Sequence, residues 1–251
     1  MKQISLQEAR DLYLTHPARL ISQEQSRIYY ENFSGDVDVI PYLVCGCLAV
    51  KSGNSWHIHA LSENAELLSA IESVKKARGS ADESLMVLTW GNIPAGLQDK
   101  PGSYKFSRSC MPYSDDAIRT LTAADRDAVL LCCAPDPDDN NIGQGIAEDF
   151  RSGYDDYLHD PNETLLGIFI DGVLAGFVQS SREKDLGIAT INIYVSRRHR
   201  RKGYAKRLLS AISSADGNCI YCYSCVQTNE ASINTAKACG FEYRGAYLFL
   251  D

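Results

Sequence analysis

The spacing of apolar residues predicts alternating helices and strands, and a first set of them ends near residue 111. Helical spacing predicts helices at 5–14, at 22–32, and from Ser62 or Asn64 to Lys76. Alternating or continuous apolar runs predict strands at 42–51, 56–60, 85–90 and 104–111. A proline and a Ser-Asp-Asp run follow within residues 112–116, and they predict a domain boundary.

The pattern restarts at residue 117 and continues to the end of the chain. Strands are predicted at 118–121, 165–170, 173–181, 188–195, 220–226 and 243–250. Helices are predicted at 122–133, at 146–158, after residue 203 as far as about 214, and at 230–239. Thr122 with Asp125 is expected to cap the first of these, and Ser5 with Glu8 has the capping-box pattern at the start of the helix at 5–14. Asp171-Gly172 predicts a tight hairpin turn, and 135–145 is an acidic loop. The expected domains are therefore 1–113, a smaller α/β domain, and 116–251.

One strand-to-helix junction carries an unusual concentration of positive charge. The strand at 188–195 is followed by seven Lys and Arg residues between Arg197 and Arg207. The first N–H groups of a helix lack intrahelical acceptors and lie at the positive end of its dipole. A phosphate held by residues 200–205 would satisfy both conditions, and Gly203 would let the backbone approach it closely.

Two residue patterns, one at this junction and one after the next strand, carry a family resemblance. Val195 is followed by Arg200-x-x-Gly203-x-Ala205, and residues 229–241 read Asn-x-x-Ser-x-x-x-Ala-x-x-x-Gly-Phe. The two patterns resemble the acetyl-CoA signature and the second motif of the GNAT superfamily of N-acyltransferases. Their order and spacing make the joint resemblance strong, and it covers the C-terminal half only. It implies the GNAT fold, an α/β (α+β) arrangement with a mixed, mostly antiparallel sheet and flanking helices.

The resemblance implies that acetyl-CoA is the co-substrate and that the chain transfers its acetyl group to a primary amine. The basic turn would hold the pyrophosphate, and the strand at 191–195 would pair with the pantetheine arm and polarise the thioester carbonyl. The cofactor-binding residues implied in this way are Ile193, Tyr194, Val195, Arg200, Arg201, Lys202, Gly203, Tyr204, Ala205, Lys206, Asn229 and Ser232. Asn229 also precedes a helix, so it can cap that helix at the same time.

The general acid and base are less clear, because the chain departs from the family pattern. Ala236 stands where many members have an acidic tyrosine, and Ala189 stands where histone-type members have a glutamate. The candidates for the acid are Tyr223, Tyr194 and Tyr247. A thiolate can also leave unassisted, because a thiol has a pKa near 8.5. The candidates for the base are Glu183, Glu148, Asp149 and a chain of water molecules.

Charge and composition exclude several other classes of protein. The net charge of −7 argues against a general nucleic-acid binder, because such proteins need a broad basic surface. Nucleic-acid binding through the basic turn alone is a minor alternative. No apolar run approaches about 18 residues, and the N-terminus resembles an amphipathic helix rather than a signal peptide. We therefore expect a cytoplasmic protein with no membrane partner.

The nine cysteines predict buried apolar positions rather than a metal centre. Cys45, Cys47, Cys132, Cys133, Cys219, Cys222, Cys225 and Cys239 lie in apolar or periodic segments. Cys219-x-x-Cys222-x-x-Cys225 is unsuitable for zinc, since alternation on a strand directs Cys222 away from the other two. We expect no metal.

The N-terminal half repeats part of the same order of elements, but it lacks an Arg-x-x-Gly-x-Ala turn. It resembles a degenerate GNAT-like domain that binds no cofactor, as in glycine N-acyltransferase-like and other two-lobed members. An unrelated α/β domain is the alternative.

The acceptor is expected to be a small, cationic amine. The reason is the acidic group around the predicted inter-helix loop, formed by Asp136, Asp138, Asp139, Glu148, Asp149, Asp155 and Asp156. These carboxylates can equally well be a solvated surface. A protein that binds CoA without turnover is the rival to an enzyme, and the sequence allows a homodimer without selecting one.

Overall fold

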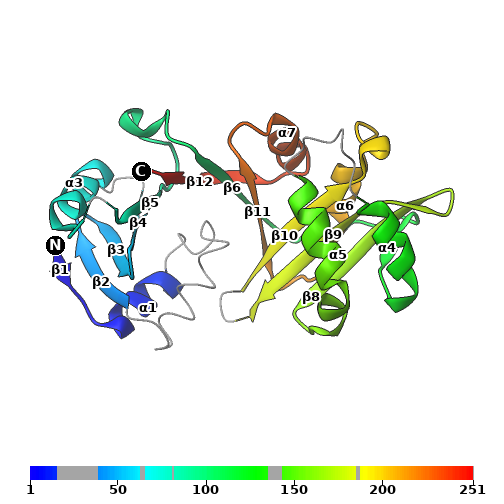
Figure 1. Ribbon diagram of the computed structural model, residues 1–251, viewed down its shortest axis with the longest axis horizontal. Helices are drawn as coiled ribbons and strands as arrows, with labels where there is room; N and C mark the ends of the chain where they lie inside the picture. The colour runs from blue at the N-terminus through cyan, green and yellow to red at the C-terminus, as the bar shows by residue number, and fades with distance from the viewer. Residues whose placement is uncertain (16–38, 63–65, 81, 135–142, 185–186, 251) are drawn as a thin grey trace. The chain divides into compact units, whose positions relative to one another are not determined.

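The computed structural model describes residues 1–15, 39–62, 66–80, 82–134, 143–184 and 187–250 (Figure 1). The helix predicted at 22–32 lies outside the described residues, and so do Asp136, Asp138 and Asp139. Contacts divide the chain into two compact units. The N-terminal unit comprises Met1–Ser107, Ser224–Ile233 and Glu242–Asp251, and the C-terminal unit comprises Arg108–Tyr223 and Asn234–Phe241. The division into domains 1–113 and 116–251 stays a prediction.

The N-terminal unit is built on a sheet of order β1-β2-β3-β4-β5-β12-β6. Its elements are β1 (Lys2–Gln3), α1 (Leu6–Thr15), β2 (Val39–Val44), β3 (Cys47–Ser52), β4 (Ser55–Ala60), α3 (Leu67–Ala77), β5 (Ser84–Leu88), β6 (Gly102–Ser109) and β12 (Glu242–Phe249). Strands β2, β3 and β4 form an antiparallel meander, and α3 then connects β4 to the parallel strand β5. The last strand of the chain, β12, inserts between β5 and β6 and is antiparallel to both.

Three details of this unit differ from the sequence prediction. The strand expected at 42–51 is two strands, because Cys45 (φ 49°) and Gly46 (φ 74°) form a tight turn in the middle of the apolar run. Cys45 is consequently exposed rather than buried. Helix α3 begins after Glu66 instead of being capped by Ser62.

The caps and the core follow from the local sequence. The capping box predicted for α1 is confirmed, because the Glu8 N–H donates to Ser5 Oγ (3.1 Å) and the Ser5 N–H donates to Glu8 Oε2 (2.9 Å). Helix α3 buries its apolar stripe against the sheet, with Leu67, Ala70, Ile71 and Val74 at helical spacing. Apolar residues of β3, β4, β5 and β12 complete that core.

The C-terminal unit is built on strands in the order β7-β8-β9-β10-β11. Its elements are β7 (Ile118–Thr120), α4 (Arg126–Cys132), α5 (Gly143–His159), β8 (Glu163–Ile170), β9 (Val173–Glu183), β10 (Ile188–Val195), α6 (Tyr204–Ile212) and β11 (Ile220–Val226), followed by α7 (Glu230–Ala238). Strands β7 to β10 are antiparallel, and β11 is parallel to β10. Helices α4 and α5 cover one face through an aromatic core with Phe150, Phe177 and Tyr194, whereas α6 packs on the other face (Figure 1).

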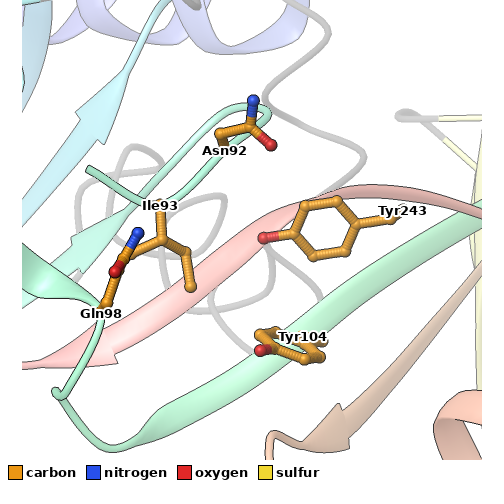
Figure 2. A pocket seen from close by; sticks show the side chains of 5 residues that line it. All are labelled: Asn92, Ile93, Gln98, Tyr104 and Tyr243. Carbon is orange, nitrogen blue, oxygen red and sulfur yellow. The ribbon is translucent and has the colours of Figure 1, made fainter. Parts of the chain in front are cut away.

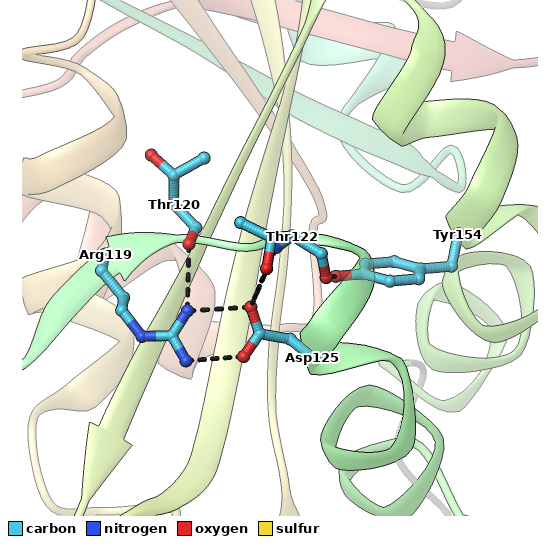
Figure 3. A network of polar contacts seen from close by, with 5 residues as sticks. All are labelled: Arg119, Thr120, Thr122, Asp125 and Tyr154. Carbon is cyan, nitrogen blue, oxygen red and sulfur yellow. Dashed lines mark hydrogen bonds and ion pairs between the residues drawn. The ribbon is translucent and has the colours of Figure 1, made fainter.

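A carboxylate fixes the start of α4. Asp125 accepts the Thr122 N–H (2.9 Å) and two guanidinium N–H groups of Arg119 (2.8 and 2.5 Å), as Figure 3 shows. The Tyr154 hydroxyl of α5 donates to the Thr122 carbonyl (2.7 Å). The Arg119 hydrogen bonds hold the pKa of Asp125 well below its usual range, so the carboxylate stays charged. The cap predicted from Thr122 and Asp125 is confirmed, and it ties both helices to β7.

The two units repeat one order of elements. In each unit three antiparallel strands are followed by a helix and then by a strand parallel to the third: β2-β3-β4-α3-β5 and β8-β9-β10-α6-β11. This repetition is consistent with the two-lobed resemblance of the N-terminal half, which itself stays a prediction. Among the described residues, no helix is long and apolar enough to span a bilayer.

We predict that acid destabilises the N-terminal unit through His57 and His59. Both are buried on β4, and the His59 ring lies edge-on to Tyr13 of α1, 6.2 Å between centroids. Burial lowers the pKa from 6.5 to about 4 for His57 and to about 3 for His59. The unfolded chain therefore takes up protons first, and stability falls as pH drops from about 6.5 toward 4, by on the order of 2 kcal/mol per histidine between pH 7 and 5.

Urea unfolding at a series of pH values measures this loss. The matched variant is His57→Gln with His59→Gln, and the difference from the wild type cancels the contribution of other groups. If the substitutions prevent folding, the imidazole C–H signals of the native protein can be followed by NMR during an acid titration. A wild-type stability curve as flat as that of the variant, or imidazoles that protonate near pH 6.5 in the folded protein, would contradict the prediction.

Candidate functional site

The turn between β10 and α6 has an open, left-handed backbone. Arg201 has φ 64° and Gly203, the N-cap of α6, has φ 80°. A Cβ atom added to Gly203 would meet no atom within 4 Å, so the space above the turn is open. The first intrahelical bond of α6 runs from the Arg207 N–H to the Gly203 carbonyl (3.2 Å). The N–H groups of Tyr204, Ala205 and Lys206 therefore precede the helical ladder and are directed at the opening.

The basic side chains of the turn have different surroundings. Arg197, Arg198, Arg201, Lys202 and Lys206 are exposed. Arg207 instead makes a two-pronged ion pair with Asp115, with both N···O distances at 2.6 Å, and these bonds lower the pKa of Asp115 to about 2. His199 is half-buried, and its pKa is lowered by burial and by Lys202 and Arg198. The turn thus keeps a neutral imidazole among exposed cations.

Arg200 and Ser196 secure the end of β10. The Arg200 Nε donates to the Val195 carbonyl (3.0 Å), and its guanidinium lies 5.9 Å from the centre of the Tyr194 ring. The Ser196 N–H and hydroxyl both donate to the Ala175 carbonyl on β9, at 3.0 and 3.1 Å. Among the implied phosphate ligands, Arg200 is therefore partly engaged with the strand itself.

Strand β10 extends beyond its parallel ladder with β11. The ladder joins Ile188–Ile191 to Ile220–Tyr223. The antiparallel ladder with β9 continues to the end, with Ile193 opposite Val178, Tyr194 opposite Phe177 and Val195 opposite Gly176. The ladder with β11 thus ends before residues 192–195, whereas the ladder with β9 includes them. A strand edge of this kind offers backbone N–H and C=O groups to an extended ligand.

The catalytic candidates lie at different distances from this edge. Tyr223 is buried where the ladder with β11 ends, opposite Ile191, with its ring edge-on to Phe241. Tyr194 is buried in the aromatic core against Phe177. Glu183 is opposite Ile188 at the far end of β10, about 16 Å along the strand from Ile193 at 3.3 Å per residue. The structure therefore does not bring Glu183 to the edge at 192–195.

The second motif is divided by the boundary between the units. Asn229 and Ser232 belong to the N-terminal unit, and the Ser232 N–H donates to Asn229 Oδ1 (3.1 Å). The helix-capping role of Asn229 is therefore confirmed, and contact of either residue with a cofactor stays a prediction. Ala236 is fully buried in α7, and Tyr247 lies on β12 of the N-terminal unit.

A chain of polar side chains that the sequence analysis missed reaches this edge. Glu163 on β8 accepts hydrogen bonds from Gln179 Nε2 (2.9 Å) and the Ser181 hydroxyl (2.5 Å), both on β9. The Asn192 Nδ2 on β10 donates to Gln179 Oε1 (3.4 Å). Because a carboxylate only accepts hydrogen bonds, it fixes the orientation of both amides and leaves Asn192 Oδ1 to accept from a further group. Asn192 is exposed beside Ile193.

The remaining predicted features have simple outcomes. Cys110 is half-buried, and every cysteine except Cys110 and the exposed Cys45 is buried. The described residues include no group of three or more His, Cys, Asp and Glu placed to hold a metal ion. On α5, Glu148, Asp149, Asp155 and Asp156 are exposed, and Asp155 forms an ion pair with Arg126.

Part of the chain matches a known family, and solved structures have a similar fold. Residues 133–241 match the model of the acetyltransferase (GNAT) family. This range includes both motifs found in the sequence. A GNAT-family acetyltransferase from Colwellia psychrerythraea has a similar structure, with 13% identity, a TM-score of 0.62, and 100% of this chain and 99% of that chain covered. No curated protein matches the sequence.

Two further solved structures have the same fold over most of their length. One is a Drosophila protein at 14% identity, with a TM-score of 0.52 and 99% of this chain and 98% of that chain covered. The other is a conserved protein of unknown function from Staphylococcus epidermidis at 12% identity, with a TM-score of 0.51 and 85% and 94% covered. Identities this low show the fold alone. The predicted fold class, a mixed sheet with flanking helices, is confirmed.

Proposed function

We propose that the chain moves an acetyl group from acetyl-CoA to a primary amine, since residues 133–241 match the acetyltransferase (GNAT) family. The observation that carries the proposal is the contrast between β10 and β4. The β4–β5 ladder runs from Ser55 to His59, whereas the β10–β11 ladder stops at Ile191. Only β10 leads into an open, glycine-containing basic turn, since residues 61–66 contain neither glycine nor a cation.

The residues present fit a CoA thioester. The diphosphate would lie over Gly203, where the helix N–H groups converge and the side chains of Arg201, Lys202 and Lys206 add positive charge. The pantetheine arm carries amide groups, which can pair with the one-sided edge at 192–195. Backbone N–H groups near Ile193 to Val195 would then polarise the thioester carbonyl.

The reaction would proceed by direct attack. The neutral amine nitrogen bonds to the thioester carbonyl carbon, the C–S bond breaks, the CoA thiolate leaves, and the ammonium proton passes to a base. Among the tyrosines Tyr223 is the best-placed acid, because it lies where the open edge begins. The base is a carboxylate or a chain of water molecules, and Glu183 would act only through such a chain. A protein that binds CoA without turnover remains the rival function, since Ala236 cannot protonate a thiolate.

We further propose that Asn192 positions the acceptor amine. Hydrogen bonds from Asn192 to Gln179 and from Gln179 to Glu163 orient the Asn192 Oδ1. Asn192 directly precedes Ile193, the first residue whose backbone N–H would polarise the carbonyl. An amine N–H donated to this oxygen would bring the nitrogen lone pair to that edge. The exposed carboxylates Glu148, Asp149 and Asp156 on α5 of the same unit favour a small cationic amine.

Turnover is the first test. The purified full-length chain, incubated with acetyl-CoA and a panel of mono-, di- and polyamines, should release free thiol only when an amine is present. Thiol release is read with a colour-forming disulfide reagent, and the acetylated amine is identified by mass spectrometry. CoA binding without thiol release on a wide panel would favour the binding protein, and the absence of both would exclude the site.

The turn is tested by a matched pair of substitutions. Gly203→Glu places a carboxylate where the diphosphate would lie, so we expect the affinity for CoA in calorimetry to fall by at least about 100-fold, roughly 2.7 kcal/mol. Gly172→Glu is the control, because Gly172 has nearly the same φ (79° against 80°) and an equally open surrounding in the β8–β9 turn. Both variants bear the same backbone strain. Equal affinities for CoA would remove the turn from the site.

The role of Asn192 is tested through the KM for the amine. Asn192→Leu removes the acceptor oxygen at similar size, and we expect the amine KM to rise about tenfold, equivalent to 1.4 kcal/mol, with the KM for acetyl-CoA unchanged. Glu163→Gln should have a smaller effect of the same sign, because the two amides can then reorient. Thr190→Val, on the same face of β10, is the control. A proportional rise in both KM values would indicate distortion of β10 instead.

A further inference from the structure

A hollow lies within the N-terminal unit, and none of the residues proposed above for acetyl transfer lines it. It has a volume of about 410 Å³ and is lined by Asn92, Ile93, Gln98, Tyr104 and Tyr243, as Figure 2 shows. We call it the tyrosine pocket. Its volume is within the range of small-molecule sites, about 300–1,000 Å³.

The pocket has a rigid floor and a polar rim. Tyr104 on β6 and Tyr243 on β12 are half-buried, and their rings meet edge to face with centroids 5.5 Å apart. The segment between β5 and β6 supplies the opposite side, where the buried Leu97 anchors a short 3-10 turn (Ala95–Leu97). Ile93 and Tyr104 also pack against the main core of the unit. The exposed carboxamides of Asn92 and Gln98 stand at the rim.

The chemistry of the lining selects an uncharged ligand. None of the five lining side chains carries a charge, so an anion or cation would lose its hydration without compensation. Burial and the neighbouring Tyr104 raise the pKa of Tyr243 to about 12. At neutral pH Tyr243 is therefore an uncharged phenol that keeps its O–H donor. The tyrosine ring faces and the apolar side chain of Ile93 can pack against a planar group. The carboxamides of Asn92 and Gln98 can each donate and accept hydrogen bonds.

We propose that the tyrosine pocket binds a neutral purine base carrying an amino group, as in adenosine. A planar base would stack against a tyrosine ring and Ile93, while the paired donor and acceptor of Gln98 or Asn92 match the amino group and ring nitrogen on one edge of adenine. The phosphate of a nucleotide would project from the open side and gain nothing. The proposed acetyl transfer makes no use of these residues, so this site is independent of the proposed function.

The test is a titration of the full-length chain with adenosine. Trp90 packs against the same core as Ile93 and Tyr104, so its fluorescence reports on the pocket. The Gly203→Glu variant is used throughout to prevent adenine from binding at the turn. We expect saturable binding of adenosine, similar binding of adenosine monophosphate, and at least about tenfold weaker binding of purine riboside, which has the same rings and sugar but lacks the amino group.

Variants decide the assignment. Gln98→Ala and Asn92→Ala lie on the exposed rim and should weaken adenosine binding, by about tenfold for whichever amide pairs with the base. Gln3→Ala, an exposed amide elsewhere in this unit, should leave it unchanged. No saturable signal at millimolar adenosine overturns the proposal. Binding that survives both rim substitutions, or equal binding of purine riboside, overturns the assignment to an amino-bearing purine. Much tighter binding of the monophosphate than of adenosine would contradict the uncharged lining.

Discussion

The pairing of β10 with β9 along its whole length is the constraint on which the candidate site depends. Backbone N–H and C=O groups at a strand edge need hydrogen-bond partners. A strand whose ladder on one side stops partway along it is therefore unstable unless the ladder on its other side continues. Strand β9 supplies that support from Ile188 to Val195, and Arg200 and Ser196 secure the end through carbonyl groups of β10 and β9. The edge at 192–195 can therefore stay open without loss of the strand. Under the proposed function, the amides of a CoA thioester would pair with this edge and its phosphates would lie at the basic turn.

Much of this arrangement could be predicted from local sequence, because it depends on local chemistry. The caps at Ser5 and Thr122, the Asp171-Gly172 turn and the basic turn before α6 all came from residues close together in the chain. Three features could not be predicted. The Cys45-Gly46 turn interrupts an apolar run that looks continuous in the sequence, since apolar residues lie on both sides of the turn. A bulge between Ile168 and Phe169 shifts the β8–β9 register, so counting from the turn does not place Glu163 opposite Ser181. The pairing of β12 with β5 and β6 joins segments remote in sequence.

The two units share an order of elements but differ at the turn between the third antiparallel strand and the following helix. Both contain a meander, a crossover helix and a parallel strand, and both bury an apolar helix stripe on the sheet. In the N-terminal unit the β4–β5 ladder continues to His59, and α3 starts after a glutamate that provides no side-chain cap. An acidic side chain at the helix N-terminus occupies the electrostatic position that a phosphate would need. Under the proposed function, the two units would share one order of elements and differ at the turn that holds the cofactor.

The basic residues of the turn between β10 and α6 fall into two groups, those with structural contacts and those that are exposed. Arg207 is neutralised by Asp115, and Arg200 donates to the carbonyl of Val195, so these two cations stabilise the junction itself. The exposed Arg198, Arg201, Lys202 and Lys206 have no such structural task among the described contacts. Burial lowers the pKa of His199, and so do Lys202 and Arg198. The overall charge of −7 disfavours anions elsewhere on the surface, so this small group creates a local exception. Loss of an exposed cation should therefore weaken an anionic ligand while β10 stays in place, whereas loss of Arg200 would release the end of the strand and change the site's shape as well as its charge.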